Sequence, residues 1–168
     1  MLEPPLPQNE SARIAALYAL NILDTPRENR YDRLTRIARR VFNVPISTIS
    51  MIDTNRQWFK SIDGFSLCET SRAISFCAHA ILSDDILYIE NAAKDERFSD
   101  NPLVTHEPKV RFYAGCPVRV NHLKMGTFCI VDRKPRPFSE EDRQLLRDLA
   151  NLAEQELAAA ASIMSVGN

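Results

Sequence analysis

Side chains able to bind or transform a small molecule gather in one stretch of the sequence, between Ile74 and Tyr113. Cys77 and His79 lie two positions apart in the segment I-S-F-C-A-H-A-I-L. If this segment is a short helix, residues with that spacing point in different directions. The favoured interpretation is packing by Cys77 and a hydrogen-bonded, structural His79. In the alternative, His79 forms a polar wall of a pocket.

Two arginines in the same stretch are the best candidates to orient an anionic ligand. The planar guanidinium groups of Arg97 and Arg111 match the geometry of carboxylates and phosphates. The favoured alternative is an internal ion pair that holds this segment against a sheet. The acids available for such a pair are Asp95, Glu96 and Asp100.

Aromatic and thiol side chains complete the candidate site. Phe98 and Tyr113 either stack on a ligand or fill the core, and both roles stay open. Buried free cysteines ordinarily behave as small hydrophobic residues, and the alternative for Cys116 and Cys129 is redox chemistry. The candidate ligand-binding residues are Phe76, Cys77, His79, Asp95, Arg97, Phe98, Arg111, Tyr113, Cys116 and Cys129.

Charge and composition argue against several classes of function. The 168 residues carry 21 basic and 22 acidic side chains. Arginines of residues 30–40 are interleaved with acids, which is typical of a solvated helix face rather than a nucleic-acid surface. Cys77 and His79 are too few for a zinc site, so neither metal nor cofactor is expected. No apolar run approaches the roughly 18 residues of a membrane span, and a reduced, cytoplasmic setting is expected.

The candidate residues need elements that position them. Helices are predicted over 9–23, over 26–42 after a capping box of Thr25, Pro26 and Glu28, over part of 70–82, and from Ser139 to about residue 160. Strands are predicted over 44–53, 57–62, 86–90, 111–120 and 124–132. Pro117 requires an edge or a bulge, and Trp58 with Lys60 is expected to pack under the terminal helices.

This order of elements indicates an α+β domain around an antiparallel sheet. Residues 1–8 are expected to be a flexible lead-in, 9–160 a single domain and 161–168 a flexible tail. The terminal helices are expected on one face of the sheet, with apolar surface left for a second copy. The short helix and the long connection before residue 111 would enclose a pocket on the other face.

Six segments, in this order, resemble those of GAF domains, and more narrowly the bacterial sensor type found before diguanylate cyclases and sensor histidine kinases. The resemblance covers about residues 10–157. The segments are A-L-x-x-L-N-I-L-D-T-P-x-E from Ala16, D-x-x-x-Q-W-F-K-S from Asp53, S-F-C-A-H-A-I from Ser75, D-E-R-F-S-D-N-P-L-V from Asp95, R-F-Y-A-G-C-P-V from Arg111 and G-T-F-C-I-V-D from Gly126. The resemblance implies a PAS-like antiparallel sheet of five or six strands, a homodimer formed through the end helices, and a ligand-dependent change passed to an output domain such as a diguanylate cyclase or histidine kinase.

The sequence departs from two well-understood branches of that family. The letters of the cyclic-nucleotide signature N-K…F…D-E occur here in the wrong order and spacing, so cyclic-nucleotide binding is not expected. Bilin-binding members have adjacent Cys and His, whereas Ala78 separates Cys77 from His79.

Three functions are therefore compared. The favoured one is a non-catalytic signalling module that binds an unidentified small molecule. The second is a redox enzyme similar to the free methionine-R-sulfoxide reductases of this family, using Cys77 and Cys116. That branch has a further cysteine in the long connection, which residues 83–110 lack. The third is a dimerisation domain with a collapsed pocket and no ligand.

Overall fold

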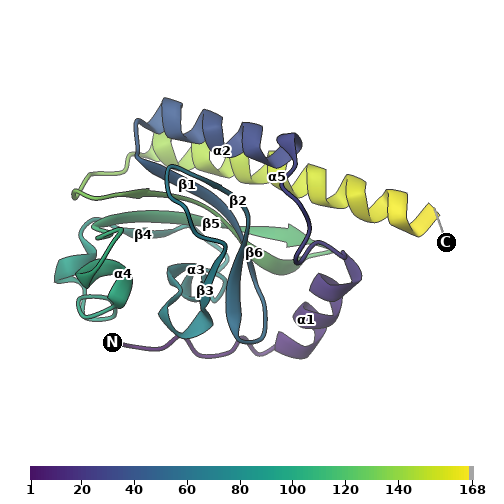
Figure 1. Ribbon diagram of the computed structural model, residues 1–168, viewed down its shortest axis with the longest axis horizontal. Helices are drawn as coiled ribbons and strands as arrows, with labels where there is room; N and C mark the ends of the chain where they lie inside the picture. Colours follow the sequence, from purple (N-terminus) through teal and green to yellow (C-terminus); the bar gives the residue numbers. More distant parts are fainter. Residues whose placement is uncertain (167–168) are drawn as a thin grey trace.

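A six-stranded antiparallel sheet forms the centre of the molecule, with the strand order β3-β2-β1-β6-β5-β4. The computed structural model describes the backbone of residues 1–166 and the side chains of residues 1–162. The strands are β1 (Ile46–Ile52), β2 (Arg56–Asp63), β3 (Glu69–Ser71), β4 (Leu87–Ile89), β5 (Phe112–Val120) and β6 (Leu123–Asp132). The central strands β1, β6 and β5 (Figure 1) lie between two hydrophobic layers.

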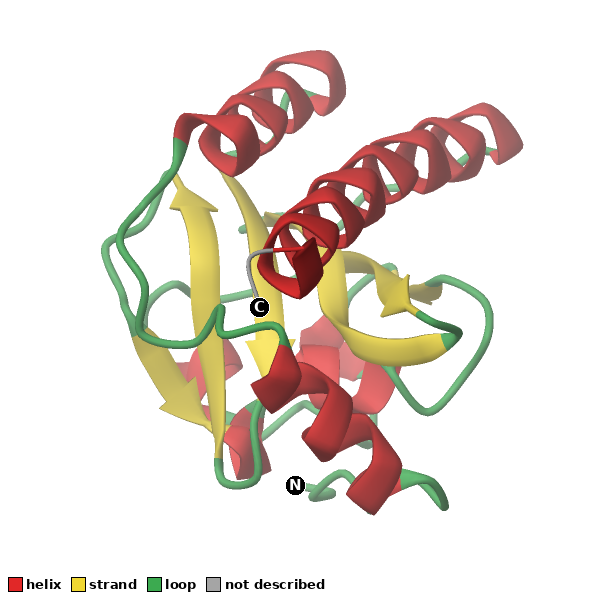
Figure 2. Cartoon of the chain, turned by 90° about the vertical axis from the view of Figure 1, so that its right-hand side faces the viewer, coloured by secondary structure: helices red, strands yellow, loops and turns green. Residues whose placement is uncertain are grey.

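Long helices cover one face of this sheet and short ones the other. The helices are α1 (Glu10–Ala19), α2 (Asn29–Phe42), α3 (Phe76–Ala80), α4 (Pro102–Thr105), α5 (Glu140–Val166) and the 3-10 turns η1 (Arg72–Ile74) and η2 (Ala92–Lys94). Figures 1 and 2 show α2 and α5 together on one face, with α3 and α4 on the opposite face. This is the predicted α+β arrangement.

The alternation of residues along the strands decides which layer each side chain enters. On β1, Ile49 and Met51 join the helix-covered layer, whereas Ile46 and Ile52 join the opposite layer. This division follows from the strand geometry, because successive strand residues point to opposite faces. Trp58 and Lys60 of β2 lie on the helix-covered face, as predicted, with the Lys60 ammonium 5.5 Å from the centre of the Tyr31 ring.

The predicted capping box before α2 is wrong. The helix begins at Asn29, and Glu28 precedes it without a capping hydrogen bond from its side chain. Lys60 Nζ instead binds all three residues of the expected capping box. It donates to Thr25 Oγ1 (2.9 Å) and Pro26 O (2.6 Å), and it forms an ion pair with Glu28 (2.7 Å). Charge-assisted bonds to a buried ammonium are stronger than the neutral bonds of a cap, so the tertiary contact determines the local structure.

Helix α1 differs from the expectation in length and in place. It ends at Ala19 rather than at residue 23, and it packs at the end of the sheet against β6 instead of beside α2 and α5. Glu10 of α1 binds two buried arginines, Arg13 at 3.0 Å and Arg72 at 2.6 Å. Arg13 also donates to the carbonyls of Lys124 and Met125 at the tip of the β5–β6 hairpin. One carboxylate thus joins α1, the hairpin and η1.

The hairpin between β5 and β6 turns tightly without glycine. Asn121 and His122 both have positive φ, 52° and 67°, as a two-residue hairpin turn requires. Pro117 lies where β5 has no partner on its outer side, because β4 pairs only with residues 113–115. A register shift follows between Val118 and Arg119. The predicted edge or bulge at Pro117 is confirmed.

The contacts of the lead-in and the length of the last helix were not predicted from the sequence. Leu2 in the lead-in donates its N–H to Arg97 O (3.2 Å), and its carbonyl lies 3.1 Å from His79 Nε2. Helix α5 continues to Val166 rather than ending near residue 160, and residues 167–168 of the expected tail lie outside the described residues. No helix within residues 1–166 combines the length and apolar character needed to cross a bilayer.

Candidate ligand-binding cavity

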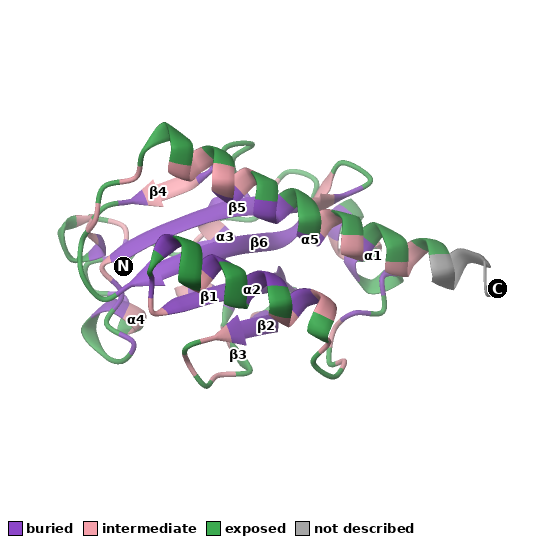
Figure 3. Ribbon diagram, turned by 90° about the horizontal axis from the view of Figure 1, so that it is seen from above, coloured by how far each residue is buried: buried purple, intermediate pink, exposed green. Residues whose placement is uncertain are grey.

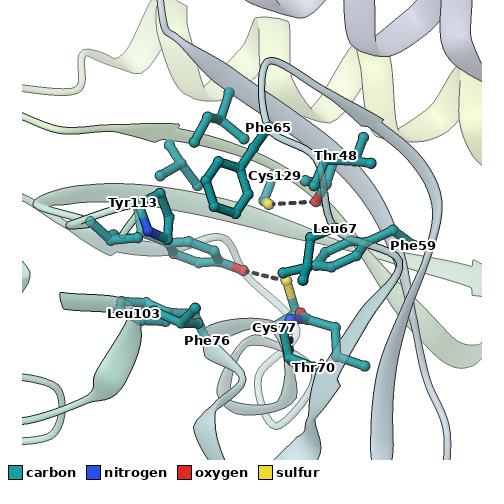
Figure 4. Close-up of a pocket in the computed structure, with 16 residues that line it drawn as sticks. Thr48, Phe59, Phe65, Leu67, Thr70, Phe76, Cys77, Leu103, Tyr113 and Cys129 are labelled. Atoms are coloured by element: carbon teal, nitrogen blue, oxygen red, sulfur yellow. Dashed lines mark hydrogen bonds between the residues drawn. The ribbon is translucent and has the colours of Figure 1, made fainter. Parts of the chain in front are cut away.

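A small cavity lies on the face of the sheet opposite α2 and α5 (Figure 4). Its volume is about 60 Å³. The strands provide its floor, α3 one wall, and residues 65–67 and 103–110 its mouth. It is lined by Ile46, Thr48, Gln57, Phe59, Ile62, Phe65, Leu67, Thr70, Phe76, Cys77, Leu103, Pro108, Val110, Tyr113, Cys129 and Val131.

The polar atoms of this cavity belong to thiols, hydroxyls and one amide. Tyr113 donates its hydroxyl hydrogen to Cys77 Sγ at 3.2 Å, and Thr48 Oγ1 lies 2.9 Å from Cys129 Sγ. Both polar atoms of the Gln57 amide are hydrogen-bonded: its oxygen accepts from Ser75 Oγ (2.9 Å), and its nitrogen donates to Thr70 Oγ1 (3.1 Å). The cavity therefore offers neutral hydrogen-bonding groups on an otherwise apolar surface.

Gly115 allows Tyr113 to lie across the sheet toward Cys77. A Cβ atom at position 115 would come within 2.1 Å of the Tyr113 hydroxyl oxygen and 2.6 Å of the adjoining ring carbon. Real Cβ contacts are not that short, and Tyr113 is only 2% exposed, so the ring has little room to move aside. The missing side chain of Gly115 thus holds the Tyr113–Cys77 contact in place.

Hydrogen bonding makes Cys77 the most acidic thiol of the cavity. Burial raises its pKa, but neighbouring thiol and hydroxyl groups that hydrogen-bond to the sulfur outweigh burial and lower the pKa to about 7. The hydrogen bond with Cys77, together with burial, raises the pKa of Cys129 well above its usual value. Burial likewise raises the pKa of the Tyr113 phenol well above its usual value. A thiolate in this cavity therefore forms on Cys77 first.

An aromatic series leads from the cavity to the lead-in segment. The Phe76 ring is tilted against Tyr113 (centroids 5.2 Å apart) and stacks on Phe98 (4.2 Å). His79 meets Phe98 edge-on at 4.9 Å. Phe98 is fully buried, so it fills the core, and neither it nor His79 lines the cavity. Desolvation lowers the pKa of His79, which lies under Leu2 instead.

The arginines proposed as anion ligands are used elsewhere. Arg97 forms the predicted ion pair with Asp95, at 2.7 Å, and lies over the outer side of the Phe98 ring. The pair lowers the pKa of Asp95, chiefly through the hydrogen bond from Arg97. Arg111 makes no ion pair in the described part of the chain. Instead, it donates hydrogen bonds to the carbonyl oxygens of Val104 (2.9 Å) and Val110 (3.0 Å). The expected ion pair of Arg111 is therefore wrong.

Cys116 lies on the other side of the sheet from Cys77. It belongs to the helix-covered layer, and burial raises its pKa to about 11. Cys77 and Cys116 therefore do not form the pair expected for a redox enzyme. Cys129 shares the cavity with Cys77 instead. Among the described residues, no three Cys, His, Asp or Glu side chains are grouped so as to hold a metal ion.

The structure thus brings together four of the predicted residues, Phe76, Cys77, Tyr113 and Cys129. Most of the remaining lining was missed. Strand alternation could have predicted Thr48 and Ile46 as cavity residues, since both point to the face opposite Ile49 and Met51. No comparable signal marks Phe65 and Leu67, which reach the cavity from the loop between β2 and β3.

Comparison with known proteins agrees with this fold. The model of the family described as GAF domain matches residues 26–157. A cyclic di-GMP phosphodiesterase of Pseudomonas aeruginosa is 38% identical over 154 residues, which are 90% of this chain but only 26% of that protein. The chain therefore spans about a quarter of that relative.

Three solved structures share the fold at low sequence identity. The blue-light absorbing form of the Thermosynechococcus elongatus PixJ GAF domain has a TM-score of 0.66 at 12% identity, over 92% of each chain. The free methionine-R-sulfoxide reductase of Neisseria meningitidis in complex with its substrate has a TM-score of 0.65 at 11% identity, over 98% of each chain. The GAF domain of the Acinetobacter phosphoenolpyruvate-protein phosphotransferase has a TM-score of 0.62 at 20% identity, over 94% of this chain and 98% of that one. With the family match over most of its length, the chain belongs to the GAF domain family.

Proposed function

We propose that this GAF domain is a non-catalytic sensory module, in which a small molecule bound in the cavity changes how two copies associate through α2 and α5. The observation that carries the proposal is that the cavity floor and the core beneath α2 and α5 use alternate residues of the same strands. Cys129 faces the cavity, and its neighbours Phe128 and Ile130 face the helices.

This arrangement supplies a physical route from ligand to helices. A ligand that shifts β6 on the cavity side also moves Phe128 and Ile130, because the interior is close-packed and transmits displacement. On β5, Tyr113 likewise faces the cavity and its neighbour Ala114 faces the helices. Helix α5 packs directly on β5. The requirement for signalling is only that the ligand has different affinities for two helix arrangements.

The outer face of α2 and α5 suits a second copy of this chain. Ile37 and Val41 of α2 and Leu152 of α5 are exposed apolar residues on it, and Figure 3 shows this side of both helices largely exposed. The exposed basic residues of α2 are Arg33, Arg36 and Arg40, and the exposed acids of α5 are Glu140, Glu141 and Asp148. A two-fold axis that brings α2 of one copy onto α5 of the other would pair these charges twice.

The positions of the cysteines argue against the expected Cys77–Cys116 redox pair, whereas Cys129 lies in the cavity with Cys77. A reductase needs its attacking and resolving thiols on the same side of the sheet, and Cys116 lies on the opposite side from Cys77. If this domain acts within a longer protein, an output domain such as a diguanylate cyclase or a histidine kinase is a natural recipient of a change in α5.

Two measurements test this function. Analytical ultracentrifugation is expected to find a dimer that Ile37→Asp weakens at least tenfold, whereas Leu82→Asp, at an exposed leucine outside α2 and α5, leaves it unchanged. A metabolite screen by thermal shift, with native mass spectrometry of freshly purified protein, is expected to find a stabilising ligand that alters the dimer constant. A monomer, or a complete screen without a shift, refutes the proposal. Turnover of free methionine-R-sulfoxide with thioredoxin and NADPH refutes its non-catalytic part.

A further inference from the structure

We infer that the ligand of this cavity is an uncharged, largely apolar molecule of about two to four non-hydrogen atoms with a single hydrogen-bonding group. This inference rests on the proposed sensory function and specifies the chemistry of its signal. It follows from three properties of the cavity: the absence of charge in its lining, the character of its polar groups, and its size.

No charged side chain lines the cavity within the described part of the chain. Three charged groups of the surrounding elements are engaged away from it. Arg97 pairs with Asp95, Arg111 is bound to two carbonyl oxygens, and Lys60 lies on the other face of the sheet with Glu28. A charged ligand would lose its hydration here without gaining a counter-charge, which is strongly unfavourable.

The polar groups that remain suit one neutral group of a ligand. The Tyr113 hydroxyl has lone pairs left after it donates to Cys77, and Thr48 and Cys129 form a second hydroxyl–thiol pair. Each of these groups can rotate its hydrogen, so it can donate to a carbonyl or accept from a hydroxyl. Gln57 is already held on both sides of its amide. One hydroxyl or carbonyl is therefore well accommodated, and the rest of the ligand meets apolar side chains.

The volume limits the size of the ligand. A cavity of roughly 150 Å³ holds benzene with its six carbon atoms, and this one measures about 60 Å³. In proportion, about two to four non-hydrogen atoms fit. The same reasoning excludes a free amino acid sulfoxide, which carries an ammonium and a carboxylate group and is larger than the cavity.

The test uses three probes of four non-hydrogen atoms each that differ in charge: 1-propanol, acetate and propylammonium. Each is titrated at millimolar concentration into methyl-labelled protein, and NMR follows the methyl groups of Ile46, Leu67 and Val131. The expected result is saturable shifts with 1-propanol and at least 100-fold weaker binding of both ions, because each would be buried without a partner charge. If an ion binds as tightly as 1-propanol at these methyls, the inference is overturned while the sensory function stands.

Three variants make the test specific for this cavity. Leu67→Trp fills the mouth from a loop, where the domain tolerates change, and is expected to abolish the 1-propanol shifts. Leu82→Trp, the same exchange at an exposed position, should leave them unchanged. Thr70→Lys adds a cation at the rim and should strengthen acetate binding at least tenfold. If none of the three probes shifts the lining methyls of the wild type, both the ligand class and the sensory function of this cavity are refuted.

Discussion

Replacement of Gly115 by alanine tests the packing on which the cavity depends. The new Cβ atom would lie 2.1 Å from the Tyr113 hydroxyl oxygen, 2.6 Å from Cζ and 2.8 Å from Cε1. Strand propensity alone would make this exchange favourable by about 0.5–1 kcal/mol, since glycine weakens a strand relative to alanine. The collision reverses the sign, because Tyr113 is enclosed and its ring has to move.

The magnitude follows from two losses. Forcing extra atoms into a packed core costs about 1–3 kcal/mol. Moving the ring also breaks the hydrogen bond to Cys77, which is worth about 1 kcal/mol. After the gain in strand propensity is subtracted, Gly115→Ala is expected to lower the free energy of unfolding by about 1–3.5 kcal/mol, measured by urea denaturation followed by circular dichroism.

A double-mutant cycle separates this collision from other effects. In a Tyr113→Leu background the ring atoms that meet the new Cβ are gone, so Gly115→Ala should then cost less than about 1 kcal/mol. Equal costs in the two backgrounds, or no cost in the wild type, would show that Gly115 does not position Tyr113.

Three further predictions concern the charged and capping groups. Burial raises the pKa of Glu10, but its bonds to Arg13 and Arg72 outweigh this and lower it from 4.5 to about 2. The ionised Glu10 therefore contributes at most about 3 kcal/mol to stability. This contribution is complete above about pH 4.5 and is lost as the pH falls toward 2. Glu10→Gln should abolish this pH dependence in urea unfolding. A pH-independent difference between Glu10→Gln and wild type would contradict it. Because the pKa of Cys77 is lowered to about 7, its reaction with a small neutral disulfide should rise with pH around neutrality and be lost in Cys77→Ser; modification of Cys129 or Cys116 before Cys77 would be the opposing result. Asn101→Ala removes the N-cap of α4 and the bond to Ile74 O, and calorimetry should find a loss of about 1–3 kcal/mol; an unchanged midpoint would rule out that role.

Strand alternation explains what could be predicted from the sequence. It accounts for the two faces of β1 and for the common face of Trp58 and Lys60 on β2. The same rule also separates Tyr113 from Cys116, because residues three apart on a strand point to opposite faces. The inclusion of Cys116 among the candidate site residues therefore conflicts with periodicity already present in the sequence.

The long connection before β5 was less predictable, because tertiary contacts decide its conformation. Arg97 and Asp95 pair locally, as expected from their proximity. The rings of Phe98 and His79, however, are placed by Phe76 on α3 and by the lead-in segment. The failed capping box has a similar cause, since the buried ammonium of Lys60 comes from a distant strand. Local sequence does not encode such partners.

The carboxylate of Glu10 also sets the boundary of the folded unit. The family match begins at residue 26, yet a protein shortened to that point would lose α1. Arg72 would lose the anion that neutralises its guanidinium, and the apolar neighbours of Leu17 and Leu20 would face water. Recombinant versions of this domain therefore need to start before Glu10 to remain soluble and folded.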